Sequence, residues 1–255
     1  MMNKRWIFLN TGFHDGEFNM MFDQKLAHLF SAGKIKPVLR VYGWRPYTIS
    51  IGYNQDENVF DFEKIKSSGI GFVRRPTGGR AILHSEELTY SVVMNADGKS
   101  VLDVYNLLSQ AIAKGLSLLG AEFELEESQP DFVKLYKHFN SIPCFASSAK
   151  YEIHYKGKKV VGSAQRRYGD VVLQHGSILI GGYHKRLPEF LKVDSRDLID
   201  QIKYEIENKT ICLNEIFGRE VSFEEVAVAL KKGFEIELGI EFEDLSQIKF
   251  QEMIL

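Results

Sequence analysis

Cysteine, proline and long apolar runs are all scarce in this sequence. Its 255 residues include only 2 Cys and 6 Pro, and no segment repeats. Two cysteines cannot form a disulfide framework, and this composition excludes collagen-like and low-complexity chains. The apolar run at residues 6–9 is too short for a signal-peptide core or a membrane span. We therefore expect a cytoplasmic protein with reduced thiols that has no membrane association.

The sequence also lacks an excess of charge of either sign. The chain has 32 Lys and Arg against 34 Asp and Glu, a net charge of -2. Such a balance provides no global field for nucleic acid, so no nucleic-acid partner is expected and a charged partner needs a local patch. One hypothesis gathers seven arginines into a basic face for acidic protein partners: Arg40, Arg45, Arg74, Arg75, Arg80, Arg166 and Arg167. The histidines and the two distant cysteines show no ligand spacing, so no metal site is expected.

The periodicity of apolar residues predicts helices and strands in separate blocks. A helix is expected after Asp15, whose side chain can cap it. Capping boxes at residues 100–103 and 222–225 predict two more helices. Runs of β-branched and aromatic residues predict strands, the last three as an antiparallel meander: 6–9, 37–42, 47–51, 71–75, 88–93, 151–155, 158–164 and 171–180. Blocks of this kind favour an α+β fold, a mixed or antiparallel β-sheet flanked by helices.

The domain organisation predicted for the chain is simple. No Pro-rich or Ser-rich linker divides it. We expect residues 1–255 to form a single catalytic domain, with a core at about 5–185 and a short C-terminal helical segment at about 186–255.

The first segment with residues suited to chemistry is the arginine-flanked glycine pair at residues 74–84. Adjacent glycines, Gly78 and Gly79, let backbone N–H groups approach a ligand, and arginines pair with anionic or carbonyl oxygens. A tight turn with solvated arginines explains the segment equally well. Its spacing matches neither the Walker nor the Rossmann fingerprint.

A second segment, residues 158–167, runs from a predicted strand into small residues. Lys159, close to Gly162, can place a cation over a carbonyl oxygen and stabilise the oxyanion of an acyl transfer. Considered alone, the segment is better explained as a cationic strand edge that discourages aggregation.

The cysteines and two histidines offer nucleophile and base candidates. Cys144 lies in a small, polar loop broken by proline, where a thiolate nucleophile is plausible. Cys212 lies in an apolar run and is expected to be a packed, inert thiol. His84 and His175 lie in or after apolar runs, and either can serve as a base for Cys144, but a hydrogen-bonded structural role is favoured for both.

Taken together, these segments resemble the biotin/lipoate protein ligase and octanoyltransferase superfamily. Within it the sequence is most similar to the cysteine-dependent octanoyltransferases of lipoate assembly in Gram-positive bacteria. The resemblance covers about residues 5–185 and rests on motifs that agree in order: 42–46, 50–55, 74–84, 87–91, 143–145, 157–165 and 174–179.

The resemblance implies transfer of an octanoyl group from acyl carrier protein to a lysine of a lipoyl domain, such as the glycine cleavage H protein. It implies that Cys144 carries a thioester intermediate and that Lys159 contacts the acyl carbonyl or activates the incoming amine. It also implies no cofactor, because thioester exchange is nearly thermoneutral and the transfer from thioester to amide is downhill. The residues that it assigns to substrate binding are Arg75, Gly78, Gly79, Arg80, His84, Gly162, Ser163, Gln165 and His175.

Two alternative enzymes stay open, and a third alternative, a regulator, is disfavoured. An ATP-dependent lipoate–protein ligase shares the fold and the lysine, although Arg80 stands where such ligases more often have a third glycine. An amidotransferase that moves octanoyl or lipoyl groups between two lipoyl domains is barely distinguished by the sequence. A biotin-sensing regulator would need a helix-turn-helix ahead of the domain, where the strand predicted at residues 6–9 leaves no room.

Overall fold

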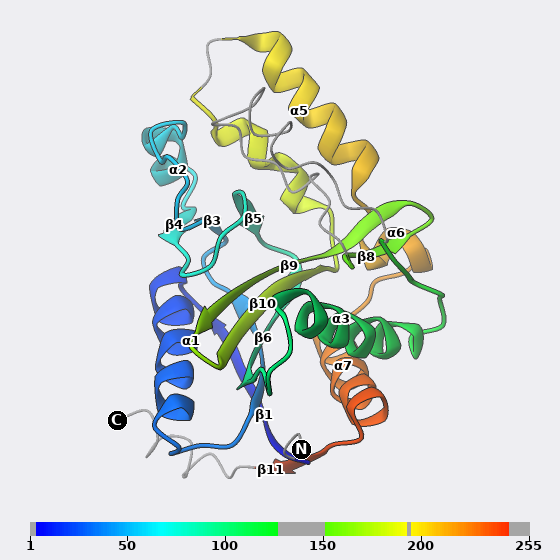
Figure 1. Cartoon of the computed structure of the whole chain (residues 1–255). Helices are drawn as coiled ribbons and strands as arrows, with labels where there is room; N and C mark the ends of the chain where they lie inside the picture. The colour runs from blue at the N-terminus through cyan, green and yellow to red at the C-terminus, as the bar shows by residue number, and fades with distance from the viewer. Residues whose placement is uncertain (1–3, 127–150, 193–194, 245–255) are drawn as a thin grey trace.

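The computed structural model of the chain describes residues 4–126, 151–192 and 195–244. In this part of the chain a mixed sheet of eight strands has the order β11-β1-β2-β6-β10-β9-β8-β7 (Figure 1). β1 pairs in parallel with β2 and β11, and the other pairs are antiparallel. The strands are β1 (Arg5–His14), β2 (Val38–Trp44), β6 (Glu87–Asn95), β7 (Glu124–Leu125), β8 (Ile153–Tyr155), β9 (Lys158–Tyr168), β10 (Val171–Leu179) and β11 (Glu241–Asp244).

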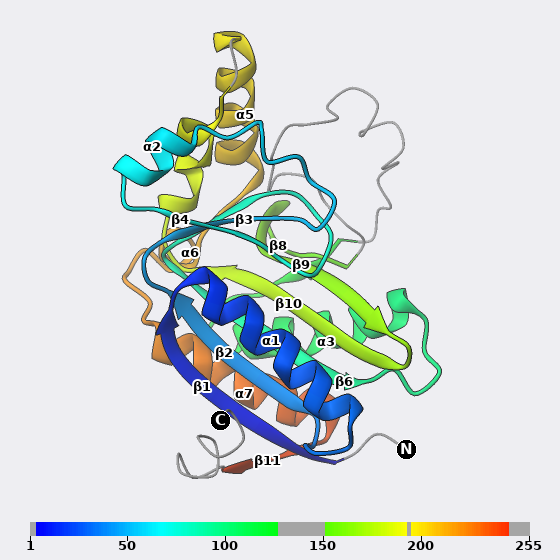
Figure 2. The same ribbon diagram turned by 90° about the vertical axis from the view of Figure 1, so that its left-hand side faces the viewer.

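Helices cover both faces of this sheet. α1 (Gly16–Ser31) lies on one face, while α3 (Val101–Ser117) and α7 (Phe223–Leu238) lie on the other (Figure 2). The helix starts agree with the sequence, because the Asp15 side chain caps α1 and both predicted capping boxes form at α3 and α7. The predicted α+β class, a mixed sheet flanked by helices, is confirmed, as is the meander of β8, β9 and β10.

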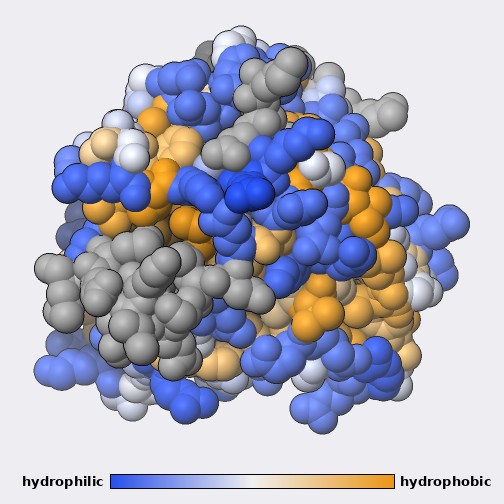
Figure 3. Space-filling model, turned by 90° about the horizontal axis from the view of Figure 1, so that it is seen from below, coloured by the Kyte–Doolittle hydropathy of each residue, from blue (hydrophilic) through white to orange (hydrophobic). Residues whose placement is uncertain are grey.

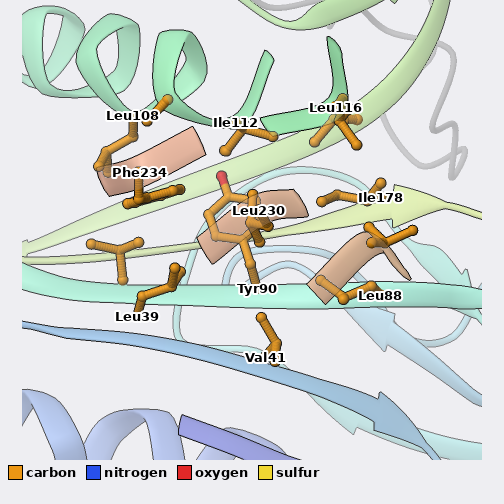
Figure 4. Packing of buried hydrophobic residues seen from close by; sticks show 14 of the residues in the cluster. Leu39, Val41, Leu88, Tyr90, Leu108, Ile112, Leu116, Ile178, Leu230 and Phe234 are labelled. Atoms are coloured by element: carbon orange, nitrogen blue, oxygen red, sulfur yellow. The ribbon is translucent and has the colours of Figure 1, made fainter. Parts of the chain in front are cut away.

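The main hydrophobic core lies between the sheet and the helix pair α3 and α7. Figure 4 shows side chains of β2, β6 and β10 meeting those of the two helices. The residues labelled there are all buried: Leu39, Val41, Leu88, Tyr90, Leu108, Ile112, Leu116, Ile178, Leu230 and Phe234. Residues after 185 therefore contribute to the same core as the predicted core region. The assignment of residues 1–255 to a single domain stays a prediction.

A smaller sheet stands beside the large one. Among the described residues it has the order β4-β3-β5, with β4 (Gly71–Arg74) parallel and β5 (Ile82–His84) antiparallel to β3 (Thr48–Ile51). Its apolar side chains pack against further helices: α2 (Phe62–Ser67), the 3-10 helix η1 (Tyr183–Phe190) and α5 (Arg196–Lys209). The short helix α6 (Leu213–Phe217) follows. The predicted strands 37–42 and 47–51 thus lie in different sheets, and the connection at residues 45–47 passes from one sheet to the other.

The surface carries scattered apolar side chains. On the face at the bottom of Figure 1, hydrophobic side chains gather in separate patches interrupted by hydrophilic ones (Figure 3). Single exposed apolar residues of this kind are normal. Within the described ranges, no helix combines the length and the apolar character that crossing a membrane requires.

Two glycines set the closest approach of α3 and α7. A Cβ added to Gly233 would lie 2.3 Å from the backbone nitrogen and 2.4 Å from the Cα of Gly115. A Cβ on Gly115 would in turn lie 2.7 Å from the carbonyl oxygen of Ala229. Because these neighbours are backbone atoms, the helices must separate to admit a methyl group.

We expect Gly233→Ala to destabilise the protein by about 1–3 kcal/mol, because the main core must open to relieve the clash. Urea unfolding of the two proteins measures this difference. Val228→Ala on the same helix, at a side chain that is 69% exposed, should change stability by less than about 0.5 kcal/mol. Equal stabilities of Gly233→Ala and the unmodified chain would contradict the close crossing.

Candidate functional site

The loop of residues 75–80 between β4 and β5, which we call the glycine loop, contains the predicted glycine pair. The Arg75 guanidinium holds it in shape. Arg75 is buried, and burial lowers its pKa to about 10. Its Nη2 donates to the carbonyl oxygens of Gly78 at 2.8 Å and Arg80 at 2.7 Å. Its Nη1 donates to the carbonyl and hydroxyl oxygens of Ser50, both at 3.1 Å. Arg75 therefore binds its own loop and the neighbouring strand β3.

Two more carbonyl groups of this loop also accept hydrogen bonds. The Tyr53 backbone N–H donates to the Thr77 carbonyl at 2.9 Å, and Arg166 Nη1 donates to the Pro76 carbonyl at 2.7 Å. Because Arg166 is on β9, the second contact joins the loop to the strand that carries Lys159.

With the carbonyl groups turned inward, the amide groups of the glycine pair face outward. Gly78 and Gly79 are exposed, and their N–H groups make no hydrogen bond to any residue in ranges 4–126, 151–192 and 195–244. Gly79 has φ +92, a conformation that requires glycine. Adjacent free N–H groups of this kind can bind a carboxylate, a phosphate or a developing oxyanion.

Gly52 lies directly against this loop. A Cβ at Gly52 would lie 2.0 Å from the carbonyl oxygen of Gly79, so no side chain fits without moving the loop. The motif at residues 50–55 thus helps to position the glycine loop, because the backbone of Gly52 packs directly against it.

His84 is enclosed between β3 and β6. Its Nε2 lies 2.7 Å from Ser50 Oγ and its Nδ1 lies 2.7 Å from Glu87 Oε1. The ring stacks on Trp44 with centroids 4.0 Å apart. The Glu87 carboxyl is buried, which by itself raises its pKa, but His84 and two hydroxyl groups outweigh this and lower the pKa overall.

His175 on β10 is enclosed in a similar way. Its Nε2 lies 2.6 Å from Thr77 Oγ1 and its Nδ1 lies 3.3 Å from Asp23 Oδ2. Asp23 also accepts from Arg40 Nη1 at 2.8 Å. Both ring nitrogens of His84 and of His175 are therefore occupied by protein partners, an arrangement in keeping with the structural role favoured for them.

Strand β9 carries the other predicted site residues. Gly162 and Ser163 lie opposite Ser177 and Gly176 of β10. Ser163 Oγ lies 2.7 Å from the hydroxyl of Tyr90, whose pKa is raised to about 12 by burial.

Gln165 closes a chain of polar side chains on the same strands. Its Nε2 donates to Gln174 Oε1 at 3.0 Å, and Gln174 Nε2 donates to the Tyr90 hydroxyl at 3.0 Å. Ser163 and Gln165 thus belong to one buried to half-buried network.

Lys159 is buried and paired with Glu152. Its Nζ donates to Glu152 Oε1 at 2.7 Å, and both side chains are less than one tenth exposed. The Lys159 carbonyl accepts from the backbone N–H of Ile211 at 3.0 Å, so the chain after α5 also fixes this position. Glu152 is not among the site residues predicted from the sequence. Its signal was a lone carboxylate at the start of the first strand of the meander, seven residues before the lysine.

The remaining predictions have mixed outcomes. Cys144 lies outside the described residues, so its place relative to Lys159 stays a prediction. Cys212 is buried and its pKa is raised to about 11 by burial, which confirms a packed, inert thiol. The seven-arginine face is wrong for Arg40 and Arg75, which are 0% and 4% exposed, because these two cations hold internal oxygens instead.

Within the described ranges, no group of three His, Cys, Asp or Glu side chains could bind a metal ion.

Gly52→Ala is expected to lower the kcat/KM of the octanoyl transfer that the sequence resemblance implies by about 100-fold, because the new methyl group displaces the glycine loop. Gly182→Ala is the matched control, since its Cβ would meet no atom within 4 Å. Steady-state transfer assays of both variants measure the effect. A Gly52→Ala protein that transfers at the normal rate would show that the loop position is unimportant.

Glu152→Gln should destabilise the protein by about 3–5 kcal/mol, because it leaves the buried ammonium of Lys159 without this carboxylate. The double variant Glu152→Leu with Lys159→Met should regain most of that stability, yet lose the octanoyl transfer that the sequence resemblance implies. Chemical unfolding and transfer assays on the same preparations separate the two effects. Unchanged unfolding of Glu152→Gln would argue against a stabilising ion pair.

Comparisons of the sequence with known proteins identify its family. The family described as the lipoyl protein ligase A/B catalytic domain matches residues 15–235. An octanoyltransferase LipM of Geobacillus kaustophilus is 39% identical over 250 residues, covering 95% of this chain and 90% of that protein. The LipM of Bacillus subtilis is 37% identical over 256 residues, covering 97% and 92%.

Solved structures show the same fold. A lipoate-protein ligase A bound with ATP superimposes with a TM-score of 0.77 at 25% identity, covering 99% of this chain and 93% of the other. A bipartite lipoate protein ligase of Thermoplasma acidophilum also has a TM-score of 0.77, at 23% identity, covering 99% and 91%. From the family match over most of its length and from its relatives, the chain belongs to the lipoyl protein ligase A/B catalytic domain family.

Proposed function

We propose that this chain is an octanoyltransferase that moves an octanoyl group from acyl carrier protein, through a thioester on Cys144, to a lysine of a lipoyl domain. An octanoyltransferase of lipoate assembly is the function that the relatives support. The observation that carries it is the 37–39% identity to curated octanoyltransferases over nearly the full length of the chain. The acyl carrier protein as donor and the glycine cleavage H protein as acceptor are the partners that we propose.

The proposed reaction has two acyl transfers. In the first, the Cys144 thiolate attacks the carbonyl carbon of the carrier thioester, and the carrier thiolate leaves. In the second, the neutral amine of the acceptor lysine attacks the Cys144 thioester, the Cys144 sulfur leaves, and the proton lost by the amine passes to that sulfur. The product is an octanoyl amide. Each step passes through one tetrahedral oxyanion, which needs hydrogen-bond donors or a cation nearby.

Lys159 and the glycine loop are the donors that we assign to these oxyanions and to anionic groups of the substrates. Because Lys159 is paired with Glu152 at 2.7 Å, the pair carries no net charge. Its field therefore falls off quickly with distance, and we expect Lys159 to act by direct donation at short range. The outward N–H groups of Gly78 and Gly79 supply donors that need no reorganisation.

The proposed nucleophile also bears on where the protein works. A thiolate must stay reduced, which fits the cytoplasm and fits a chain with only 2 cysteines. We propose that residues 1–255 act there as one catalytic domain.

The test is intact-mass measurement after incubation with octanoyl-acyl carrier protein in the absence of ATP. We expect a gain of one octanoyl group, lost in Cys144→Ser and kept in Cys212→Ala, because only Cys144 is assigned the thioester. Addition of a lipoyl domain should then move the group to the acceptor lysine.

Other outcomes of the same assay separate the alternatives. Transfer only from free octanoate with ATP would overturn the proposal in favour of a ligase. Loading from an octanoylated lipoyl domain, with none from the carrier protein, would instead identify an amidotransferase.

A further inference from the structure

Two buried chains of hydrogen-bonded side chains, built from the same kinds of residue, converge on the loop of residues 75–80. In each, a carboxylate contacts a histidine and the histidine contacts a hydroxyl group. One chain runs from Glu87 through His84 to Ser50, with successive distances of 2.7 and 2.7 Å. It reaches the loop because Arg75 donates to Ser50 Oγ at 3.1 Å.

The second chain reaches the loop directly. It runs from Asp23 on α1 through His175 on β10 to the hydroxyl of Thr77, with distances of 3.3 and 2.6 Å. Thr77 is 1% exposed, whereas the two glycines that follow it are exposed. Thr77 is therefore the last anchored residue before the amide groups that face outward.

The charges around His175 define which nitrogen holds the proton. Burial would raise the pKa of Asp23, but Arg40 and His175 outweigh it, so Asp23 is a carboxylate. Burial lowers the pKa of His175, and Arg75 and His84 lower it further, against the opposing effect of Asp23. A neutral His175 donates Nδ1–H to Asp23, so that its Nε2 accepts the hydroxyl hydrogen of Thr77.

We propose that Asp23 and His175 are positioning residues for the octanoyl transfer: they fix the Thr77 hydroxyl and thereby the outward N–H groups of Gly78 and Gly79. This inference rests on the proposed function for its catalytic consequence. Its structural part, a loop held in shape by a histidine on a neighbouring strand, stands independently of the reaction.

The geometry explains why one hydroxyl group matters here. The Thr77 backbone is held on one side by Tyr53, whose N–H donates to its carbonyl at 2.9 Å, and the side chain is held on the other side by His175. Loss of the second contact leaves the residue free to rotate about the first. Shifts of about 1 Å in groups that bind a reacting substrate lower rates strongly.

Thr77→Val tests the proposal, because it removes the hydroxyl group and keeps the shape of the side chain. Thr77→Ser restores the hydroxyl. Thr48→Val is the matched control, since Thr48 is also 1% exposed and its hydroxyl donates to the Pro46 carbonyl at 2.9 Å, outside the loop.

The first measurement is ¹⁵N relaxation of the Gly78 and Gly79 amides, which needs no substrate. We expect their order parameters to fall from about 0.85 to below about 0.6 in Thr77→Val, and to stay unchanged in Thr77→Ser and Thr48→Val. Unchanged order parameters in Thr77→Val, or an equal fall in Thr48→Val, would overturn the proposal.

The second measurement is steady-state transfer. We expect kcat/KM to fall about tenfold in Thr77→Val and to recover in Thr77→Ser. Long-range ¹H–¹⁵N spectra of His175 should show a protonated Nδ1 and an unprotonated Nε2, and the reverse tautomer would contradict the assigned chain. Absence of transfer in the unmodified protein would overturn the proposed function alone, because the relaxation experiment still decides whether His175 holds the loop.

Discussion

The buried guanidinium of Arg75 is the interaction on which the candidate site depends. Removing a guanidinium from water is costly unless its N–H groups find oxygens, and here the oxygens are carbonyl groups of its own loop and of Ser50. Arg75 holds the carbonyl oxygens of Gly78 and Arg80, and the Tyr53 N–H holds that of Thr77. The N–H groups of Gly78 and Gly79 face outward as a result. A positive charge inside the protein thus prepares a site for negative charge at its surface.

Two buried ion pairs join elements close to the candidate site. Asp23 and Arg40 are both 0% exposed, and the Arg40 guanidinium also stacks over the ring of Tyr42 at 3.9 Å. Lys159 and Glu152 form a second pair on the meander. Such pairs add little stability compared with apolar side chains of equal size, but each permits only one arrangement of its partners. Their value here is the exact placement of α1 against β2 and of the lysine on β9.

Local features of the fold were predictable from the sequence, and distant contacts were not. Asp15 and the two capping boxes act within four residues, so the starts of α1, α3 and α7 could be predicted. β5 was missed because its three residues are too few to show a period. The partners of His175 could not be inferred because Thr77 and Asp23 lie 98 and 152 residues away in the chain. The resemblance to a known family identified the loop and the lysine, whereas only the structure shows what holds them.

The pairing of β1 with β11 has a consequence for how the protein folds. Arg5 lies beside Glu241, so the outer edge of β1 is covered by a strand that is far along the chain. The backbone of Lys159 is likewise held by Ile211, which follows α5. Contacts of long sequence separation slow folding. We expect this edge of β1 to be covered, and the backbone of Lys159 to be fixed, late in folding.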